Sequence, residues 1–186
     1  MAAFLRAYSR TEQSLAIGFA ASAVLLAAAH LFERVGGFPP CILCLDQREA
    51  HWAALGVAAV GLVLARPFKS KLGAAAAVGA LALVYAVSTG LSFYHTGVEY
   101  HFWPGPAICA AGATGGPLDL DALAAALQGP ADAPACDEVQ WRLLGVSMAG
   151  YNMLISAGLF ALTLFAAVAE TRRAREGRGI YSASRS

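Results

Sequence analysis

Four long apolar stretches alternate with shorter polar segments along the chain. The stretches run from Ser14 to Phe32, His51 to Ala65, Leu72 to Tyr94 and Leu143 to Ala169. A helix that crosses a bilayer needs roughly 20 mostly apolar residues. The second stretch reaches this length only if it starts near Gln47 and its charged ends reach out of the bilayer. We therefore expect membrane-spanning helices over residues 14–32, 47–65, 72–94 and 143–169.

Composition agrees with a membrane protein of one domain. Hydrophobic residues make up 58% of the 186 residues and charged residues 13%, whereas ordinary globular proteins carry about a quarter charged residues. Small residues crowd the stretches 20–29 and 73–79 and let lipid-embedded helices approach closely. These features predict an all-α four-helix bundle. We expect no nucleic-acid partner, because no basic patch stands apart from the ends of the spans.

The charges between the spans are sorted by sign. Cations gather before the first span, between the second and third, and in the tail 170–186, at Arg6, Arg10, Arg66, Lys69, Lys71, Arg172, Arg173, Arg175, Arg178 and Arg185. The positive-inside rule places these segments in the cytoplasm, together with both termini. Segments 33–46 and 95–142 should then lie outside. A cleaved signal peptide is the alternative for the first span.

The second outer segment contains a candidate amphipathic helix. Pro117 to Gln128 begins with proline, has two aspartates in its first turn and gathers its leucines on one face, as helices do at their start and along a buried side. The helix either lies on the membrane surface or covers the end of the bundle, and the sequence favours neither.

The cysteines are the most informative residues. Cys41 and Cys44 form a C-x-x-C in the first outer segment, and Cys109 and Cys136 lie in the second, so all four face an oxidising compartment. A disulfide across two intervening residues closes almost no loop and stabilises little, which favours redox use over inert staples. A zinc site typically has paired C-x-x-C units, and Cys109 and Cys136 are 27 positions apart. We expect no metal site.

Two further side chains are candidates for the chemistry. Arg48 lies four positions after Cys44, so one helical turn brings both to the same face. There Arg48 could stabilise a thiolate and donate hydrogen bonds to a carbonyl acceptor, or it could serve only as an interface anchor. His95 ends the third span in Tyr94-His95-Thr96-Gly97. It is a candidate for a redox or quinone-binding role, with a satisfied interface residue at the helix end as the alternative, whereas His51 should have no more than a packing or interface role.

Taken together, these motifs resemble the disulfide bond formation protein B (DsbB) family. The resemblance covers roughly residues 10 to 170, and it is carried by the segments Pro40–Arg48 and Tyr94–Gly97, by Cys109 and Cys136, and by Trp141–Met148. It implies a quinone-dependent protein thiol oxidase of the bacterial inner membrane, with ubiquinone or menaquinone as cofactor. The implied partner is a DsbA-like periplasmic thioredoxin-fold protein.

The resemblance also implies a role for each cysteine. Cys109 would be attacked by the reduced partner and would release Cys136, which attacks the Cys41–Cys44 disulfide at Cys41. Cys44 would then be the thiolate that reduces the quinone, with Arg48 beside it. A DsbA-like donor has a potential of about −120 mV, so the terminal acceptor must lie above that value.

Two functions are alternatives to the thiol oxidase. A vitamin K epoxide reductase-like enzyme also uses four helices and two cysteine pairs, but there the C-x-x-C follows the loop pair in chain order. A structural or binding membrane protein whose disulfides only hold its outer loops is the rival from another class. The spacing of Cys109 and Cys136, with an alanine-rich segment between them, departs from the family pattern and leaves the identity of the dithiol partner open.

Overall fold

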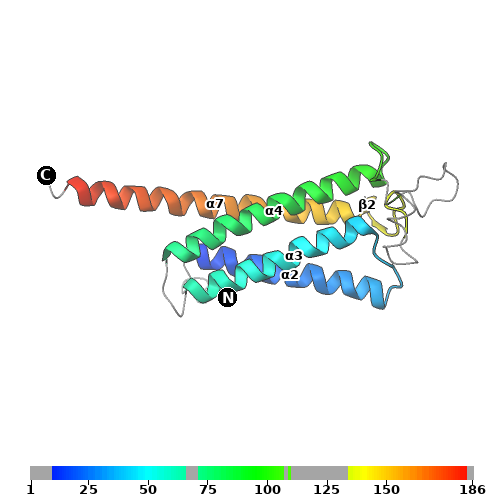
Figure 1. The fold of residues 1–186 in the computed structure, drawn as a ribbon, viewed down its shortest axis with the longest axis horizontal. Coiled ribbons are helices and arrows are strands. Elements are labelled where there is room, and N and C mark those ends of the chain that lie inside the picture. The colour runs from blue at the N-terminus through cyan, green and yellow to red at the C-terminus, as the bar shows by residue number, and fades with distance from the viewer. Residues whose placement is uncertain (1–9, 66–70, 107–108, 110–133, 184–186) are drawn as a thin grey trace.

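The computed structural model of the chain describes residues 10–65, 71–106, 109 and 134–183. Its main elements are α2 (Arg10–Arg34), α3 (Ile42–Ala65), α4 (Lys71–Glu99) and α7 (Met148–Ala183). Successive helices run in opposite directions and form one bundle (Figure 1). The start of α2 and the last turns of α7 therefore lie at the same end, and the segments with the cysteines lie at the other.

Four helices of the described residues are long and apolar enough to cross a membrane: Arg10–Arg34, Ile42–Ala65, Leu72–Glu99 and Met148–Arg172. The prediction of an all-α, four-helix membrane bundle is confirmed. The helices do not coincide with the expected spans: α3 begins at Ile42, before the span expected from about Gln47, and α7 runs from Met148 to Ala183. The helix expected over Pro117–Gln128 lies outside the described residues.

The bundle carries many of its large apolar side chains on the outside. Val24, Leu83 and Phe165 are each 67% exposed, whereas Ser22 and Ser88 are fully buried between the helices. A water-soluble bundle has the opposite distribution, because its apolar side chains escape water by packing inward. In a bilayer the apolar surface faces lipid, and the polar side chains must find partners inside the protein.

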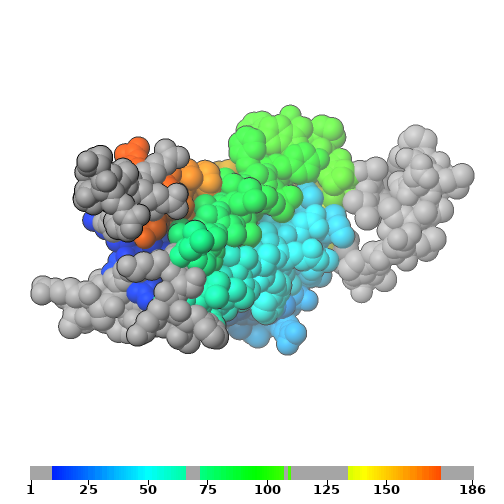
Figure 2. Space-filling view, turned by 60° about the vertical axis from the view of Figure 1, so that its left-hand side comes forward, coloured from blue at the N-terminus to red at the C-terminus, as the bar shows by residue number. Residues whose placement is uncertain are grey.

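Close packing between α3 and α4 depends on small side chains. Figure 2 shows the two helices side by side across one face of the molecule. A Cβ atom at Gly61 in α3 would lie 2.7 Å from the Cβ of Ala77 in α4 and 2.8 Å from Cδ2 of Leu15 in α2. Gly61 therefore marks a point where three helices meet without room for a methyl group.

A short hairpin leads into the last helix. Strands β1 (Arg142–Leu143) and β2 (Val146–Ser147) pair antiparallel, and the turn between them places Leu144 and Gly145 at φ of 52° and 83°. Such left-handed conformations are typical of two-residue hairpin turns. The Ser147 hydroxyl accepts a hydrogen bond from the backbone N–H of Gly150 at 3.1 Å and so caps α7. We had expected the fourth span from residue 143; the hairpin occupies its first residues.

The packing at Gly61 predicts a large difference between two glycine-to-alanine substitutions. Gly61→Ala should lower the free energy of unfolding by about 1–3 kcal/mol, because the backbone of α4 must move to admit the methyl group. Gly79→Ala is the matched control, since nothing lies within 4 Å of its added Cβ, and it should change stability by no more than about 1 kcal/mol. Thermal unfolding in detergent measures both; equal midpoints would contradict the packing argument.

Candidate active site

The C-x-x-C pair forms the start of α3. Cys41 directly precedes the helix, and its carbonyl accepts the N–H of Leu45 at 3.1 Å. Its Sγ accepts the N–H of Cys44 at 3.3 Å, the bond that a capping side chain makes, and the two sulfurs are 2.8 Å apart. Cys41 is only 3% exposed, while Cys44 is half-buried. The longer α3 thus places both sulfurs at a helix N-terminus, where the helix dipole favours a thiolate.

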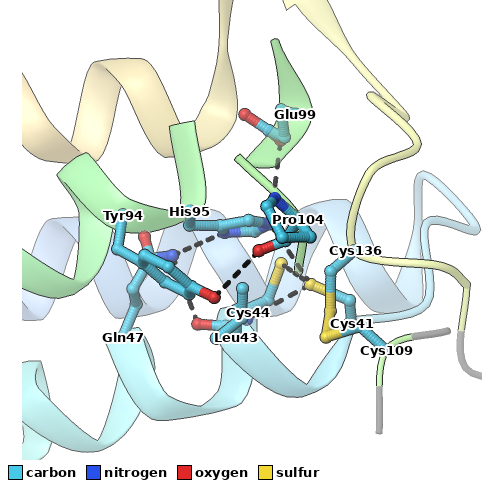
Figure 3. Close-up of a disulfide and its surroundings, with 10 residues drawn as sticks. All are labelled: Cys41, Leu43, Cys44, Gln47, Tyr94, His95, Glu99, Pro104, Cys109 and Cys136. Carbon is cyan, nitrogen blue, oxygen red and sulfur yellow. Dashed lines mark hydrogen bonds and ion pairs between the residues drawn. A yellow bond between two sulfur atoms is a disulfide. The ribbon is translucent and has the colours of Figure 1, made fainter. Parts of the chain in front are cut away.

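The second pair lies against the first. Cys109 and Cys136 form a disulfide with Cα atoms 5.3 Å apart. Both residues are buried and share one apolar cluster with Cys41, Leu43 and Val98. Figure 3 shows this disulfide beside the sulfur atoms of the C-x-x-C pair. Residues far apart in the sequence therefore bring the two cysteine pairs into one cluster.

His95 lies at the centre of the site. It is 2% exposed, and its Nε2 is 3.6 Å from the Sγ of Cys41. Its Nδ1 is 2.7 Å from the Nε2 of Gln47 on α3. The structure thus places the His95 ring inside the bundle, against the sulfur of Cys41.

Buried amides connect the site to the middle of the bundle. The Oε1 of Gln47 accepts hydrogen bonds from Asn152 on α7 at 2.7 Å and from Ser92 on α4 at 3.2 Å. The Oδ1 of Asn152 is in turn 2.8 Å from the Nε2 of His51, for which we had expected no more than a packing or interface role. Sequence reasoning missed Gln47 and Asn152, although a polar side chain within an apolar span is a reason to suspect function.

A buried carboxyl group completes the polar surroundings of His95. Glu99 follows one helical turn later in α4 and is 7% exposed. Its Oε1 is 4.0 Å from the His95 Nε2, and its other oxygen accepts a short hydrogen bond from Ser147. The sequence analysis did not single out Glu99; its spacing of four from His95, which puts both on one helix face, was the available signal.

Arg48 lies one turn after Cys44, on α3, as the spacing predicted. Its guanidinium forms an ion pair with Glu33 on α2 and donates a second hydrogen bond to the carbonyl of Ala29 at 3.3 Å. The guanidinium is thus held between two helices, which distinguishes it from a free interface anchor. The Glu33 partner was not predicted, because pairing across helices is set by the bundle geometry.

A cavity of about 340 Å³ opens beside these groups. Its walls are mainly apolar and come from α2, α7 and the segment before α3, with Leu25, Leu26, Ala29, Phe32, Phe38 and Ile155 among them. Cys44, Arg48 and Asn152 supply polar groups to the same cavity. An apolar pocket with a few convergent polar groups is the usual form of a small-molecule site.

The ligand atoms of Cys41, Cys44 and His95 all lie within 4.8 Å of one another. Thiolate sulfur and imidazole nitrogen are ligand types that zinc accepts. A C-x-x-C redox pair with a histidine packed against one of its sulfurs gives the same arrangement, so it does not by itself call for a metal.

The environment of Cys41 predicts unequal thiol reactivity in the reduced protein. Its hydrogen bond to Cys44 and its burial raise the pKa of the Cys41 thiol above the ordinary value, so at neutral pH it is almost wholly protonated and unreactive. Cys41 should be alkylated at least about tenfold more slowly than the more exposed Cys44, and its rate should still rise at about pH 10. Peptide mass spectrometry after timed alkylation measures both rates, with the denatured protein as control; equal rates in the folded protein would contradict the burial.

The comparisons with known proteins point to one family. The family described as "Disulfide bond formation protein DsbB" matches residues 11–166. A disulfide bond formation protein B of Methylococcus capsulatus is 37% identical over 153 residues, which cover 80% of this chain and 88% of the relative. A protein of the same name from Xanthomonas oryzae pv. oryzae is 33% identical over 163 residues, covering 84% and 90%. No solved structure matches the chain significantly.

The match extends over all four described spans, and the relatives are covered over most of their own length. The match includes α3, α4, nearly all of α2, the first part of α7 and both cysteine pairs. The chain belongs to the disulfide bond formation protein B family.

Proposed function

We propose that the protein is a thiol oxidase that takes two electrons from a DsbA-like dithiol protein and passes them to a membrane quinone. One observation carries the proposal: the Cys109–Cys136 disulfide packs in one cluster with Cys41 and Cys44, and both cysteines of the C-x-x-C pair also line an apolar cavity. The Cys109–Cys136 pair is thus suited to exchange with a partner protein, and the Cys41–Cys44 pair to contact with a lipid-soluble acceptor.

The cysteines act in two balanced exchanges. A thiolate of the partner attacks Cys109, and its second thiolate resolves the mixed disulfide, which leaves the partner oxidised and Cys109 and Cys136 reduced. Cys136 then attacks Cys41, and Cys44 leaves with the electron pair. Attack of Cys109 on Cys136 restores the loop disulfide and releases Cys41. Two electrons have then moved from the loop pair to Cys41 and Cys44, in line with thiolate attack on disulfides.

The cavity beside Cys44 fits a quinone head group. A quinone, when bound, supplies the two-electron oxidant that re-forms the Cys41–Cys44 disulfide. The chain contributes apolar walls that exclude water and accept an isoprenoid tail, and the Arg48 guanidinium donates N–H groups to a carbonyl oxygen. Glu33 holds that guanidinium in place. The same walls suit ubiquinone and menaquinone.

The proposed location is the bacterial inner membrane, with the cysteine end of the bundle in the periplasm and both termini in the cytoplasm. The cations concentrated in the segments at the opposite end of the bundle support this orientation. An oxidising periplasm also preserves the disulfide between Cys109 and Cys136. A DsbA-like partner would then reach the cysteine pairs from the periplasmic side.

Quinone reduction by the purified protein tests the proposal. With a reduced thioredoxin-fold donor in detergent, the wild type should lower the quinone absorbance in a donor-dependent way. Cys41→Ser and Cys109→Ser should each lower the rate of quinone reduction at least about 10³-fold, because each removes a cysteine that one of the two exchanges needs. A wild type that turns over no quinone, together with variants that unfold more easily, would support the rival in which the disulfides only staple the outer loops.

Arg48 should affect quinone binding and leave the exchange between cysteines unchanged. Arg48→Lys keeps the charge but removes the planar fork, so KM for quinone should rise about tenfold, the effect of losing a hydrogen bond from a charged donor. Arg34→Lys, an exposed arginine at the end of α2, is the matched control. An unchanged KM in Arg48→Lys would remove Arg48 from the quinone site.

A further inference from the structure

The contacts of Gln47 determine which nitrogen of His95 carries the proton. The Nε2 of Gln47 lies 3.2 Å from the backbone carbonyl oxygen of Leu43. A carbonyl oxygen only accepts hydrogen bonds, so the Gln47 atom that faces it must be the NH₂ group. The same NH₂ group is 2.7 Å from the Nδ1 of His95.

The other end of the amide agrees with this orientation. Its Oε1 accepts from the NH₂ group of Asn152 at 2.7 Å and from the hydroxyl of Ser92 at 3.2 Å. A reversed amide would place NH₂ against the NH₂ of Asn152 and oxygen against the oxygen of Leu43. Partners on α3, α4 and α7 therefore fix one orientation of Gln47.

The tautomer of His95 follows from that orientation. Because Gln47 donates to Nδ1, this nitrogen must be the acceptor, and in a neutral ring the proton then lies on Nε2. Nε2 is 3.6 Å from the Sγ of Cys41, a usual distance for a hydrogen bond to sulfur. Glu99 is more distant, at 4.0 Å. The N–H of His95 is thus directed toward Cys41, next to the backbone carbonyl of Cys136, which also accepts a hydrogen bond from the ring.

We propose that Gln47 is a positioning residue that holds His95 as the Nε2–H tautomer, so that His95 donates a hydrogen bond to the sulfur of Cys41 when Cys41 is released. Ser92 and Asn152 hold Gln47 in the required orientation. This inference rests on the proposed function, because it concerns the exchange step in which Cys41 is the leaving group.

That step creates a charge that needs a donor. Cys109 attacks Cys136, the bond between Cys109 and Cys136 forms, the bond between Cys41 and Cys136 breaks, and the electron pair remains on Cys41. A thiol with a lower pKa leaves faster, yet burial and the contact with Cys44 raise the pKa of Cys41. A second thiolate at Cys44 would repel the new charge. The His95 N–H offsets both effects at the sulfur itself.

Nitrogen NMR of the reduced protein in detergent tests the tautomer directly. The chain has four histidines, and the spectrum of His95→Ala identifies the signals of His95. In the wild type Nδ1 should give the signal of an unprotonated nitrogen and Nε2 that of a protonated one. A protonated Nδ1 in the wild type would overturn the proposal, and this readout does not depend on quinone turnover.

Gln47→Glu has nearly the same shape as the wild type but replaces the donor with an acceptor. The proton should then appear on Nδ1, whereas Gln140→Glu, a substitution at the glutamine that contacts the Pro39 carbonyl, should leave His95 unchanged. An unprotonated Nδ1 in Gln47→Glu would show that Gln47 does not control the tautomer.

A kinetic test distinguishes a positioning role of Gln47 from a purely structural one. Without quinone, reduced donor should reduce the Cys109–Cys136 disulfide of Gln47→Met at the wild-type rate. The transfer to Cys41 and Cys44, followed by acid quench and alkylation, should be about tenfold slower, the effect of losing roughly one hydrogen bond. Gln140→Met is the control. Equal transfer rates in the two variants would overturn the proposal, and loss of both steps in the wild type would instead contradict the proposed function.

Discussion

The structure depends on one constraint: a polar group between lipid-embedded helices has no water to bind, so another residue must satisfy it. Gln47 shows this most clearly, because its amide contacts Leu43, Ser92, His95 and Asn152 at once. These contacts join α3 to α4 and α7. The helices can take few other relative positions without leaving a buried amide unpaired, which costs about 1–3 kcal/mol. The position of the His95 ring is therefore a consequence of how the buried polar side chains of the bundle find hydrogen-bond partners.

The start of α3 places two neighbouring sulfurs in partly different surroundings. Cys41 caps the helix and is buried against the loop disulfide, while Cys44, one turn further on, is more exposed. Both border the cavity together with Arg48. A helix turn is the shortest rigid spacer that gives two side chains different surroundings while keeping their sulfurs 2.8 Å apart. The C-x-x-C spacing thus allows one pair to contact both a protein disulfide and a lipid-soluble acceptor.

Much of the fold and part of the site could be predicted from the sequence. The spans follow from apolar runs, and Arg48 and Cys44 share a face because helical periodicity is local. Glu33 and Asn152 could not be assigned in the same way. Their partners come from other helices, so their roles depend on how the helices rotate about their axes. The helix α3 begins before the span expected from about Gln47, because the charged residues Asp46, Arg48 and Glu49 interrupt the apolar pattern while the helix continues through them.

The Glu33–Arg48 pair shows how the bundle can keep a charge beside an apolar cavity. An isolated guanidinium in such surroundings would bear a large desolvation cost, which a carboxylate in direct contact offsets. A guanidinium has five N–H donors, and the contacts to Glu33 and Ala29 account for two of them among the described residues. Both partners belong to α2, so they hold the guanidinium from one side. Arg48 is thereby kept charged, oriented and able to donate toward the cavity, which a lysine, with its single flexible ammonium, would do with less directional control.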